Sequence, residues 1–186
     1  MPFRIVKLLP EHRLEDFSSR RPVLDDWLRR HALQAQRSNT AVTHVLVQDN
    51  RVSGYVSLAN GSILPDDMNE RIRKGVAAGL PVPTLVLARL AVEDSREGQG
   101  FGTALLLHAM RILLALADQS GVRALVVNPI DNEAATFYAK FDFEILSGVH
   151  PPMMALLTKD IRKLVHTYDE ALRRARSSQT SSAGQA

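Results

Sequence analysis

Three closely spaced glycines between two apolar runs constrain the fold of this chain more than any other feature. Gly98, Gly100 and Gly102 stand in "SREGQGFGTALL", from Ser95 to Leu106. The run before them, "PTLVLARLAV" from Pro83 to Val92, is rich in aliphatic and β-branched residues and has the length of a buried strand. Apolar residues after the glycines recur with helical spacing, at Leu105, Leu106, Ala109, Met110, Leu113, Leu114 and Ala117. The sequence therefore predicts a strand, a glycine turn and a helix.

A strand-to-helix turn of this kind can hold a phosphate, because unpaired backbone N–H groups and the peptide dipoles both favour negative charge there. Glycine lets the backbone approach the anion without a Cβ in the way. Two common phosphate loops do not fit. The chain lacks the Gly-Lys-Ser/Thr ending of a P-loop, and its G-x-G-x-G spacing differs from the G-x-G-x-x-G dinucleotide fingerprint. A glycine-rich turn without any ligand is the alternative interpretation.

Length and composition favour one compact α/β domain, since the chain has 186 residues of which 45% are hydrophobic. No apolar run approaches the length of a membrane span, and the first residues lack the apolar stretch and cleavage site of a signal peptide. We therefore expect a soluble, cytoplasmic protein with no membrane partner. The absence of cysteine excludes disulfides, thiolate metal sites and a cysteine nucleophile.

Basic residues are unevenly distributed, although the formal net charge is only +3. A group near the N-terminus consists of Arg20, Arg21, Arg29, Arg30 and Arg37. A second group consists of Arg71, Arg73 and Lys74. A basic face of this kind can steer a polyanion, and a solvated helix face is the alternative.

The first half of the chain predicts a helix followed by a β-hairpin. "RPVLDDWLRRHALQAQRS" places apolar residues on one side of a single helix and most arginines on the other. The members of the apolar side are Leu24, Trp27, Leu28, His31 and Ala35. "THVLVQDNRVSGYVSLANGSI" indicates two strands joined at Asp49 and Asn50. Residues 65–83 suit a short helix and a loop.

The second half predicts a further strand at Val122–Pro129 and a short helix, "NEAATFYAKF", capped near Asn132. "FEIL" and "MMALLTK" are expected to be closing strands, and "DIRKLVHTYDEALRRAR" a helix. The tail "SSQTSSAGQA" has low complexity and is expected to be disordered. The order of elements predicts an α/β domain with a mixed sheet.

This layout, with the glycine turn after a central strand and "DNEAATFYAKFDF" near the end, resembles the GNAT N-acetyltransferase family. The similarity is greatest to its toxin branch, which acetylates aminoacyl-tRNA, because "VLDDWLRRHALQAQ", "RVSGYVSLANGSI" and "PVPTLVLARLAV" occur in that branch's order. The likeness runs from about Phe17 to Lys163. It implies a GNAT fold with a mixed, mostly antiparallel sheet flanked by helices. Residues 1–165 would form this domain, followed by a helical extension and disordered tail at 166–186.

The resemblance also implies acetyl-CoA as the acetyl donor and assigns it a site. The edge of the strand at Leu90 and Val92 would pair with the pantetheine arm, and the turn would hold the pyrophosphate. The residues so implied in the turn and in the later helix are Glu97, Gly98, Gln99, Gly100, Gly102, Thr103, Asn132 and Ala135.

Two residues depart from the family pattern. Glu97 stands where Gln or Arg is usual, which puts a carboxylate beside the expected phosphates, and its side chain is expected to turn outward toward Arg96. Asp142 stands where Gly is usual, which suggests a changed turn after Tyr138.

Acetyl transfer from a thioester to an amine needs a neutral amine and a proton for the leaving thiolate. Tyr138 matches the family tyrosine that supplies this proton, and its phenol is a donor at neutral pH. Packing of Tyr138 in the core beside Phe137 and Phe141 is the alternative. With no cysteine available, direct attack in a ternary complex follows.

No general base and no metal site are assigned. Glu93, Asp131 and Glu133 are nearby carboxylates that suit surface or capping positions. His31 and His108 lie in helices without an H-E-x-x-H pattern and are expected to be structural.

The leading hypothesis is an aminoacyl-tRNA N-acetyltransferase toxin, with Arg29, Arg30 and Arg37 contacting tRNA phosphates. The resemblance then implies a ribbon-helix-helix antitoxin as partner and is compatible with a homodimer. A GNAT enzyme for a small or protein amine, and a non-catalytic acetyl-CoA-binding module, are the alternatives.

Overall fold

The computed structural model describes residues 3–146 and 151–183. In these residues seven strands form one sheet in the order β1-β2-β3-β4-β5-β7-β6, and all neighbours are antiparallel except the parallel pair β4 and β5. The strands are β1 (Arg4–Lys7), β2 (Val42–Gln48), β3 (Arg51–Ile63), β4 (Val82–Val92), β5 (Ala124–Val127), β6 (Glu144–Leu146) and β7 (Met153–Leu157). The expected mixed, mostly antiparallel sheet is confirmed.

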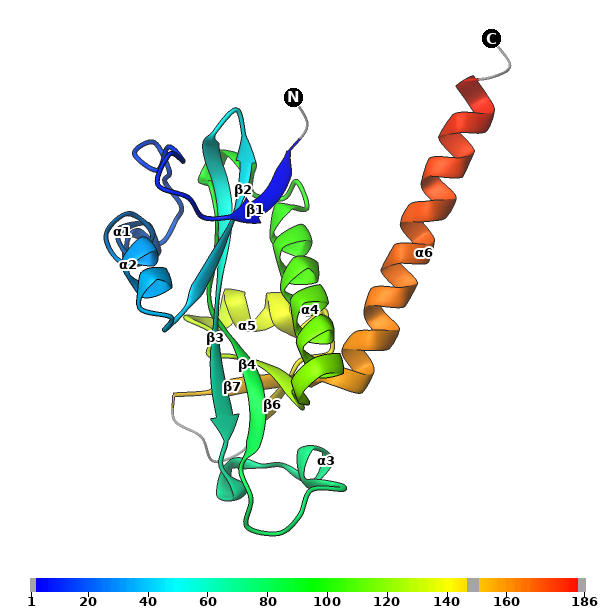
Figure 1. The fold of residues 1–186 in the computed structure, drawn as a ribbon. Helices are drawn as coiled ribbons and strands as arrows, with labels where there is room; N and C mark the ends of the chain where they lie inside the picture. The colour runs from blue at the N-terminus through cyan, green and yellow to red at the C-terminus, as the bar shows by residue number, and fades with distance from the viewer. Residues whose placement is uncertain (1–2, 147–150, 184–186) are drawn as a thin grey trace.

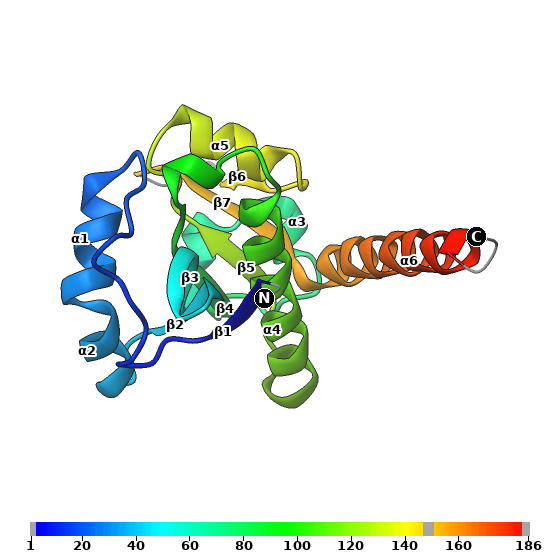
Figure 2. The same ribbon diagram turned by 90° about the horizontal axis from the view of Figure 1, so that it is seen from above.

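Helices cover both faces of this sheet (Figures 1 and 2). The α-helices are α1 (Pro22–Arg30), α2 (Ala32–Arg37), α3 (Glu70–Arg73), α4 (Phe101–Ser120), α5 (Asn132–Ala139) and α6 (Thr158–Ala183). Short 3-10 helices lie at Pro65–Asp67 and Asp94–Arg96. Helices α1 and α2 lie on one face, and α4, α5 and α6 lie on the other (Figure 2).

Two large apolar clusters correspond to the two faces. Leu28 and Ala32, from α1 and α2, pack with Tyr55 and Val45 of the sheet. On the other face, α4 packs through residues that include Met110 against the sheet, α5 and α6. This arrangement follows from the alternation of side chains along the strands, which presents apolar residues to both faces.

Several expected elements are confirmed. The hairpin turns at Asp49 and Asn50, whose φ angles of 51° and 62° fit a two-residue turn that matches the twist of the strands. Residues 65–83 contain the short helix α3 and loops. The glycine turn lies between β4 and α4, as the sequence predicts.

The first helix differs from expectation because it breaks at His31, where ψ is −26° and φ is −119°. Two helices result; their buried residues are Asp25, Leu28 and Ala32, while His31 is exposed. The expected structural role of His31 on the apolar side is therefore wrong. The edge strand β1 was not expected, because four residues with a charge at each end give little periodic signal.

Helix α6 also differs from expectation, since it continues from Thr158 to Ala183, through much of the segment expected to be disordered. Residues 177–183 contain no Gly or Pro, and extending an existing helix needs no new nucleus. The last three residues of the tail lie outside the described residues. The far half of α6 projects away from the body of the protein (Figure 1).

Helix α4 is long and apolar enough, by length and composition alone, to cross a membrane. This corrects the expectation that no apolar run approaches that length. One side of α4 is buried in the core, with Leu105, Leu106, Leu107, Ala109, Met110 and Leu113 as its buried residues. The apolar character of α4 is therefore that of a core helix that packs on the sheet.

Candidate active site

A cavity of about 660 Å³ opens where β4 ends and α4 begins. Its walls are the end of β4, the glycine turn, the start of α4, helix α5 and the segment before α1. The predicted site residues that line it are Leu90, Val92, Glu97, Gly98, Gly100, Gly102, Thr103 and Tyr138. Gln99, Asn132 and Ala135, which were also implied, are not among the lining residues.

The edge of β4 is open along this cavity. Pairing between β4 and β5 covers only Thr84 to Leu87, whereas β4 continues to Val92. β5 ends at Val127, so among the described residues the last part of β4 has no strand partner on that side. Leu90 and Val92 lie on this unpaired stretch, where an extended arm with amide groups can add hydrogen bonds to the strand.

Two of the three glycines hold a backbone conformation that other residues rarely adopt. Gly98 and Gly100 have φ angles of 73° and 82°, in the left-handed region. Gly102 lies in the first turn of α4, and a Cβ placed there would meet the ring of Phe137 at an ordinary 3.7 Å. The close spacing of the glycines is therefore a conformational requirement at two positions and not at the third.

The turn presents several backbone N–H groups without an acceptor. In the described part of the chain, no backbone or side-chain acceptor is found for the amides of Gly98, Gly100, Phe101, Gly102 and Thr103. They surround the start of a 20-residue helix, whose dipole adds positive potential. This is the geometry that binds a phosphate.

Glu97 and Gln99 behave differently from what the resemblance implies. Their own amides donate to Asp94 O at 3.3 Å and to Arg96 O at 3.4 Å, so neither is open to a phosphate. The Glu97 carboxylate pairs with Arg20 at 3.0 Å, and both residues line the cavity. Arg96, the expected partner, instead lies over the ring of Phe3.

The opposite wall of the cavity is α5. Its N-cap is Asp131, whose carboxylate accepts from Ala134 N at 2.8 Å; Asn132, the expected cap, is the first residue of the helix. This hydrogen bond and the nearby Arg21 guanidinium hold the pKa of Asp131 below its usual value.

Tyr138 lies on α5 and lines the cavity, with its ring packed between Phe137 and Phe143. The ring is 5% exposed, and within the described residues its hydroxyl has no hydrogen-bond partner. Burial raises the pKa of the phenol, so it keeps its proton at neutral pH. The ring of Tyr138 therefore belongs to the core, and the residue also lines the cavity.

Asp142 adopts a φ of 62°, the left-handed conformation that glycine favours. The amide of Asp142 donates to Ala139 O at 3.1 Å, and that of Phe143 to Tyr138 O at 3.4 Å, which ends α5. The aspartate thus adopts the backbone geometry expected of a glycine, and no altered conformation is needed to accommodate it.

Arg20 and Arg21 connect the segment before α1 to both walls of the cavity. Arg20 pairs with Asp94 at 2.9 Å and with Glu97, beside the glycine turn. Arg21 pairs with Asp131 and with Glu133 at the start of α5. The sequence indicates these arginines only as part of a basic group, because pairs separated by more than 70 residues leave no local pattern.

The arginines expected to contact tRNA lie outside the cavity lining. Arg29 is exposed and donates to Phe17 O at 3.3 Å, while Arg30 pairs with Asp26 of the same helix at 2.8 Å. Arg37 is exposed at the end of α2. They form part of the outer surface of α1 and α2.

The carboxylates considered as bases have other roles. Glu93 is 5% exposed, which corrects its expected surface position, and one of its oxygens accepts from Arg51. Asp131 caps α5, and Glu133 is exposed and paired with Arg21. In the described parts of the chain no cluster of three or more metal-ligating side chains occurs.

Comparison with known proteins identifies the family. Residues 39–145 match the acetyltransferase (GNAT) domain. The chain is also 40% identical over 149 residues to a tRNA-acetylating toxin of Mycobacterium tuberculosis, covering 80% of this chain and 88% of the relative. The chain belongs to the GNAT acetyltransferase family. The predicted GNAT fold and the predicted acetyl-CoA-dependent acetyltransferase activity are thereby confirmed.

Solved structures of GNAT toxins share the fold. AtaT in complex with acetyl-methionyl-tRNAfMet matches with a TM-score of 0.82 and 24% identity, covering 88% of this chain and 99% of AtaT. AtaTR bound with acetyl-CoA matches with a TM-score of 0.74 and 26% identity, covering 87% and 97%. A tyrosine-to-phenylalanine mutant of KacT matches with a TM-score of 0.81 and 21% identity, covering 88% and 99%.

The cavity fits the acetyl-CoA that GNAT enzymes use. The unpaired edge of β4 suits the amide-bearing pantetheine arm, and the free amides of the glycine turn suit the pyrophosphate. The residues of this chain that would hold the cofactor are therefore Leu90 and Val92, with Gly98, Gly100 and Thr103.

Proposed function

We propose that this protein is a toxin that transfers the acetyl group of acetyl-CoA to the α-amino group of an aminoacyl-tRNA and so blocks translation. The observation that carries the proposal is the 40% identity, over 80% of the chain, to a relative that is named a tRNA-acetylating toxin. The cavity supports it with a donor site and a protonated tyrosine beside it.

The amino group attacks the thioester carbonyl directly, since the chain has no cysteine to carry an acyl group. The N–C bond forms, the C–S bond breaks, and the sulfur takes a proton from the Tyr138 hydroxyl. The attacking nitrogen releases one proton to solvent, and the Tyr138 phenolate takes a proton back from solvent. An α-amino group titrates near pH 7.7 to 8.0, about two units below a lysine side chain, so much of it is neutral at physiological pH. No carboxylate of the site is needed as a base for such an amine.

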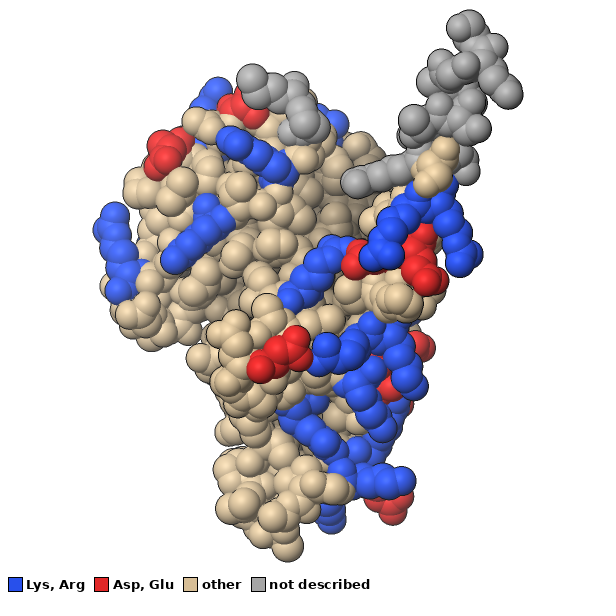
Figure 3. Space-filling view, turned by 45° about the vertical axis from the view of Figure 1, so that its right-hand side comes forward, with Lys and Arg blue, Asp and Glu red and all other residues tan. Residues whose placement is uncertain are grey.

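Basic surface supports the binding of a polyanion. Figure 3 shows Lys and Arg side chains gathered along the face that carries α6 and below it, with fewer acidic ones between them. Lys74, Lys159 and Lys163 are exposed and, within the described residues, have no ion-pair partner. Arg29, Arg30 and Arg37 add positive charge on α1 and α2.

The proposal includes partners and a location. A toxin of this kind is neutralised by an antitoxin, for which a ribbon-helix-helix protein encoded beside it is expected. A homodimer is a further part of the proposal, and a protein that acts on aminoacyl-tRNA is expected to work in the cytoplasm.

The test measures transfer of labelled acetyl to total tRNA charged with a mixture of amino acids. The wild-type protein is expected to acetylate charged tRNA and not uncharged tRNA. Acetylation of free small amines at a higher kcat/KM than charged tRNA would support the alternative of a small-amine acetyltransferase. Failure to acetylate any amine would support a non-catalytic module.

Tyr138→Phe is expected to lower kcat by about 10²- to 10⁴-fold, the range of general acid-base catalysis, while the Kd for acetyl-CoA stays unchanged. Tyr168→Phe serves as the matched control, because Tyr168 lies on α6 and stacks on Phe141 outside the cavity lining. Wild-type turnover of Tyr138→Phe at saturating acetyl-CoA would remove Tyr138 from the mechanism.

A further inference from the structure

Arg89 is a charged residue in the middle of the apolar strand β4, one residue before Leu90. Its register partner is Ser57, and the next pairs are Leu90 with Val56 and Ala91 with Tyr55. Ala91 packs in the cluster beneath α1, so Arg89, two residues earlier, faces the same side of the sheet. It therefore lies beside the open edge of β4, on the face opposite to α4.

The guanidinium of Arg89 is held in place by a stack of aromatic rings. Its central carbon lies 4.2 Å from the centre of the Trp27 ring. Trp27 also stacks on Tyr55, with 6.0 Å between the ring centroids, and Tyr55 is fully buried and donates its hydroxyl to Leu24 O at 2.8 Å. The cation–π contact with this packed ring helps to hold the guanidinium in position.

Arg89 differs from Arg20 and Arg21, the paired arginines of the cavity, because among the described residues it has no anionic partner. Within the described residues it makes no ion pair or hydrogen bond, although it is half-buried. Asp25, a buried carboxylate of α1, is already engaged by the amide and hydroxyl of Ser19. The donors of the Arg89 guanidinium are therefore free to bind an anionic ligand, and the partial burial of the side chain strengthens such a contact.

The location of Arg89 identifies the side from which a ligand comes. The acetyl group would sit at the open edge of β4 near Leu90, with α4 and the glycine turn on the donor side. Arg89 and Trp27 lie on the other side, beneath α1. In an aminoacyl-tRNA the attacking amine is a few bonds from the terminal ribose and its phosphate.

We propose that Arg89, supported by Trp27, binds a phosphate of the single-stranded 3′ end of the tRNA and so positions the aminoacyl group at the acetyl donor. The inference rests on the proposed function and adds a residue that recognises the substrate. Arginine suits this task because its planar donors match phosphate oxygens. A phosphate contact is independent of sequence, so Arg89 would not select the amino acid.

The test compares two acceptors, charged tRNA and the methyl ester of the same amino acid, which has the same amine and no phosphate. Arg89→Gln is expected to raise the KM for charged tRNA by about tenfold or more, as expected for loss of a charge-assisted contact. The same variant should leave kcat/KM for the methyl ester and the Kd for acetyl-CoA unchanged. Since one phosphate contact is lost, the salt dependence of tRNA binding should weaken by about 0.7 in the slope of log K against log salt.

Arg4→Gln is the matched control, because it removes the same charge from the edge strand β1, where Arg4 is exposed. Arg89→Lys keeps the charge without the planar donors and should give an intermediate KM; it also serves if Arg89→Gln fails to fold. An equal loss with both acceptors, or tRNA kinetics like those of Arg4→Gln, would overturn the inference alone. A wild-type protein that acetylates the ester but not charged tRNA would overturn the proposed function.

Discussion

At the residue scale, Glu97 and Arg20 determine the charge presented to the donor phosphates. Arg20 lines the cavity, yet its positive charge is shared by Asp94 and Glu97. Glu97→Gln removes one of the two carboxylates and leaves more of the Arg20 charge for a bound pyrophosphate. We expect acetyl-CoA to bind more tightly, by up to about tenfold at low ionic strength, with a smaller gain as salt screens the interaction. Calorimetric titration at two salt concentrations measures this, and weaker binding by the variant would contradict it.

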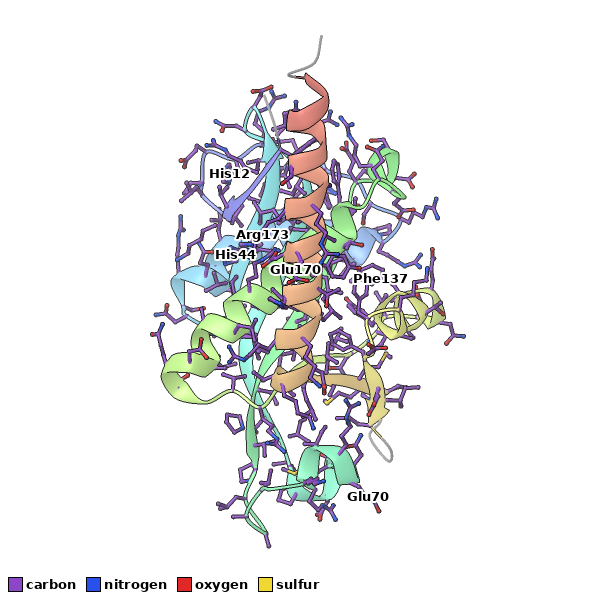
Figure 4. All side chains as sticks on the ribbon, turned by 90° about the vertical axis from the view of Figure 1, so that its right-hand side faces the viewer. His12, His44, Glu70, Phe137, Glu170 and Arg173 are labelled. Carbon is purple, nitrogen blue, oxygen red and sulfur yellow. The ribbon has the colours of Figure 1, made fainter. Side chains whose placement is uncertain are left out.

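The second feature at this scale is the contact between His44 of β2 and His108 of α4, whose ring nitrogens are 2.9 Å apart. His44 and Phe137 lie on opposite sides of α6 in Figure 4, so the histidine pair is remote from α5. Burial lowers the pKa of His44 to about 4, with smaller contributions from His108 and Lys7, and lowers that of His108, where Arg111 contributes. Both rings are therefore neutral in the folded state at pH 7.

Because the folded-state pKa values lie below the unfolded value of 6.5, the unfolded state binds more protons as the pH falls. The stability that the pair contributes is complete above pH 6.5 and is lost progressively toward pH 4. Urea unfolding between pH 7.5 and 4.5 should show a smaller loss of stability in the variant His44→Gln/His108→Gln than in the wild type. His12, which shifts in the same direction, remains in both proteins and cancels in the comparison. An identical pH dependence would exclude the pair as its source.

At the element scale, the glycine turn separates two kinds of glycine. Gly100→Ala puts a Cβ on a residue with a φ of 82°, which should cost roughly 1–2 kcal/mol of folding free energy. Gly102→Ala replaces a glycine in the first turn of α4, where alanine is favoured by up to about 1 kcal/mol and the new Cβ makes only ordinary contacts. Urea denaturation of both variants tests this, with each serving as the control for the other. Equal destabilisation would show that the turn is limited by space and not by backbone conformation.

At the scale of the whole molecule, α6 has one half that belongs to the core and one that does not. Val165 is buried, and Tyr168 stacks on Phe141, whereas the described side chains from Ala171 to Ala175 are exposed. Figure 4 shows Glu170 and Arg173 on α6, in front of the body.

Truncation after Arg176 should change the unfolding free energy by no more than about 0.5 kcal/mol. Truncation after Lys163 removes Val165 and Tyr168 and should cost several kcal/mol or prevent folding, as large core deletions do. Differential scanning calorimetry distinguishes the two, and a large loss in the first would show that the projecting part contributes to the fold.

Local chemistry explains why the order of elements and the nature of the donor site could be predicted from the sequence. Two glycines between a strand pattern and a helical stripe indicate a turn with free amides, and the structure places such a turn there. The Asp49–Asn50 hairpin and the burial of α4 follow from equally local signals. The position of Tyr138 could be predicted only through the family resemblance, because a tyrosine next to two phenylalanines is equally typical of a core helix.

Tertiary structure alone decided which groups meet across the cavity. Arg20 pairs with a carboxylate in the segment that follows β4, and Arg21 pairs with the carboxylate that caps α5. Arg89 contacts Trp27, which lies 62 positions earlier in the sequence. In the sequence, Arg89 is recognisable only as a charged residue within an apolar strand, and this pattern does not indicate which side chain the guanidinium contacts. Periodicity reports the face on which a side chain lies, whereas its partner depends on how strands and helices distant in sequence are brought together. Local sequence patterns therefore determined most of the elements and the glycine turn, whereas the packing of α1 against the sheet determined that Arg89 meets Trp27 beside the open edge of β4.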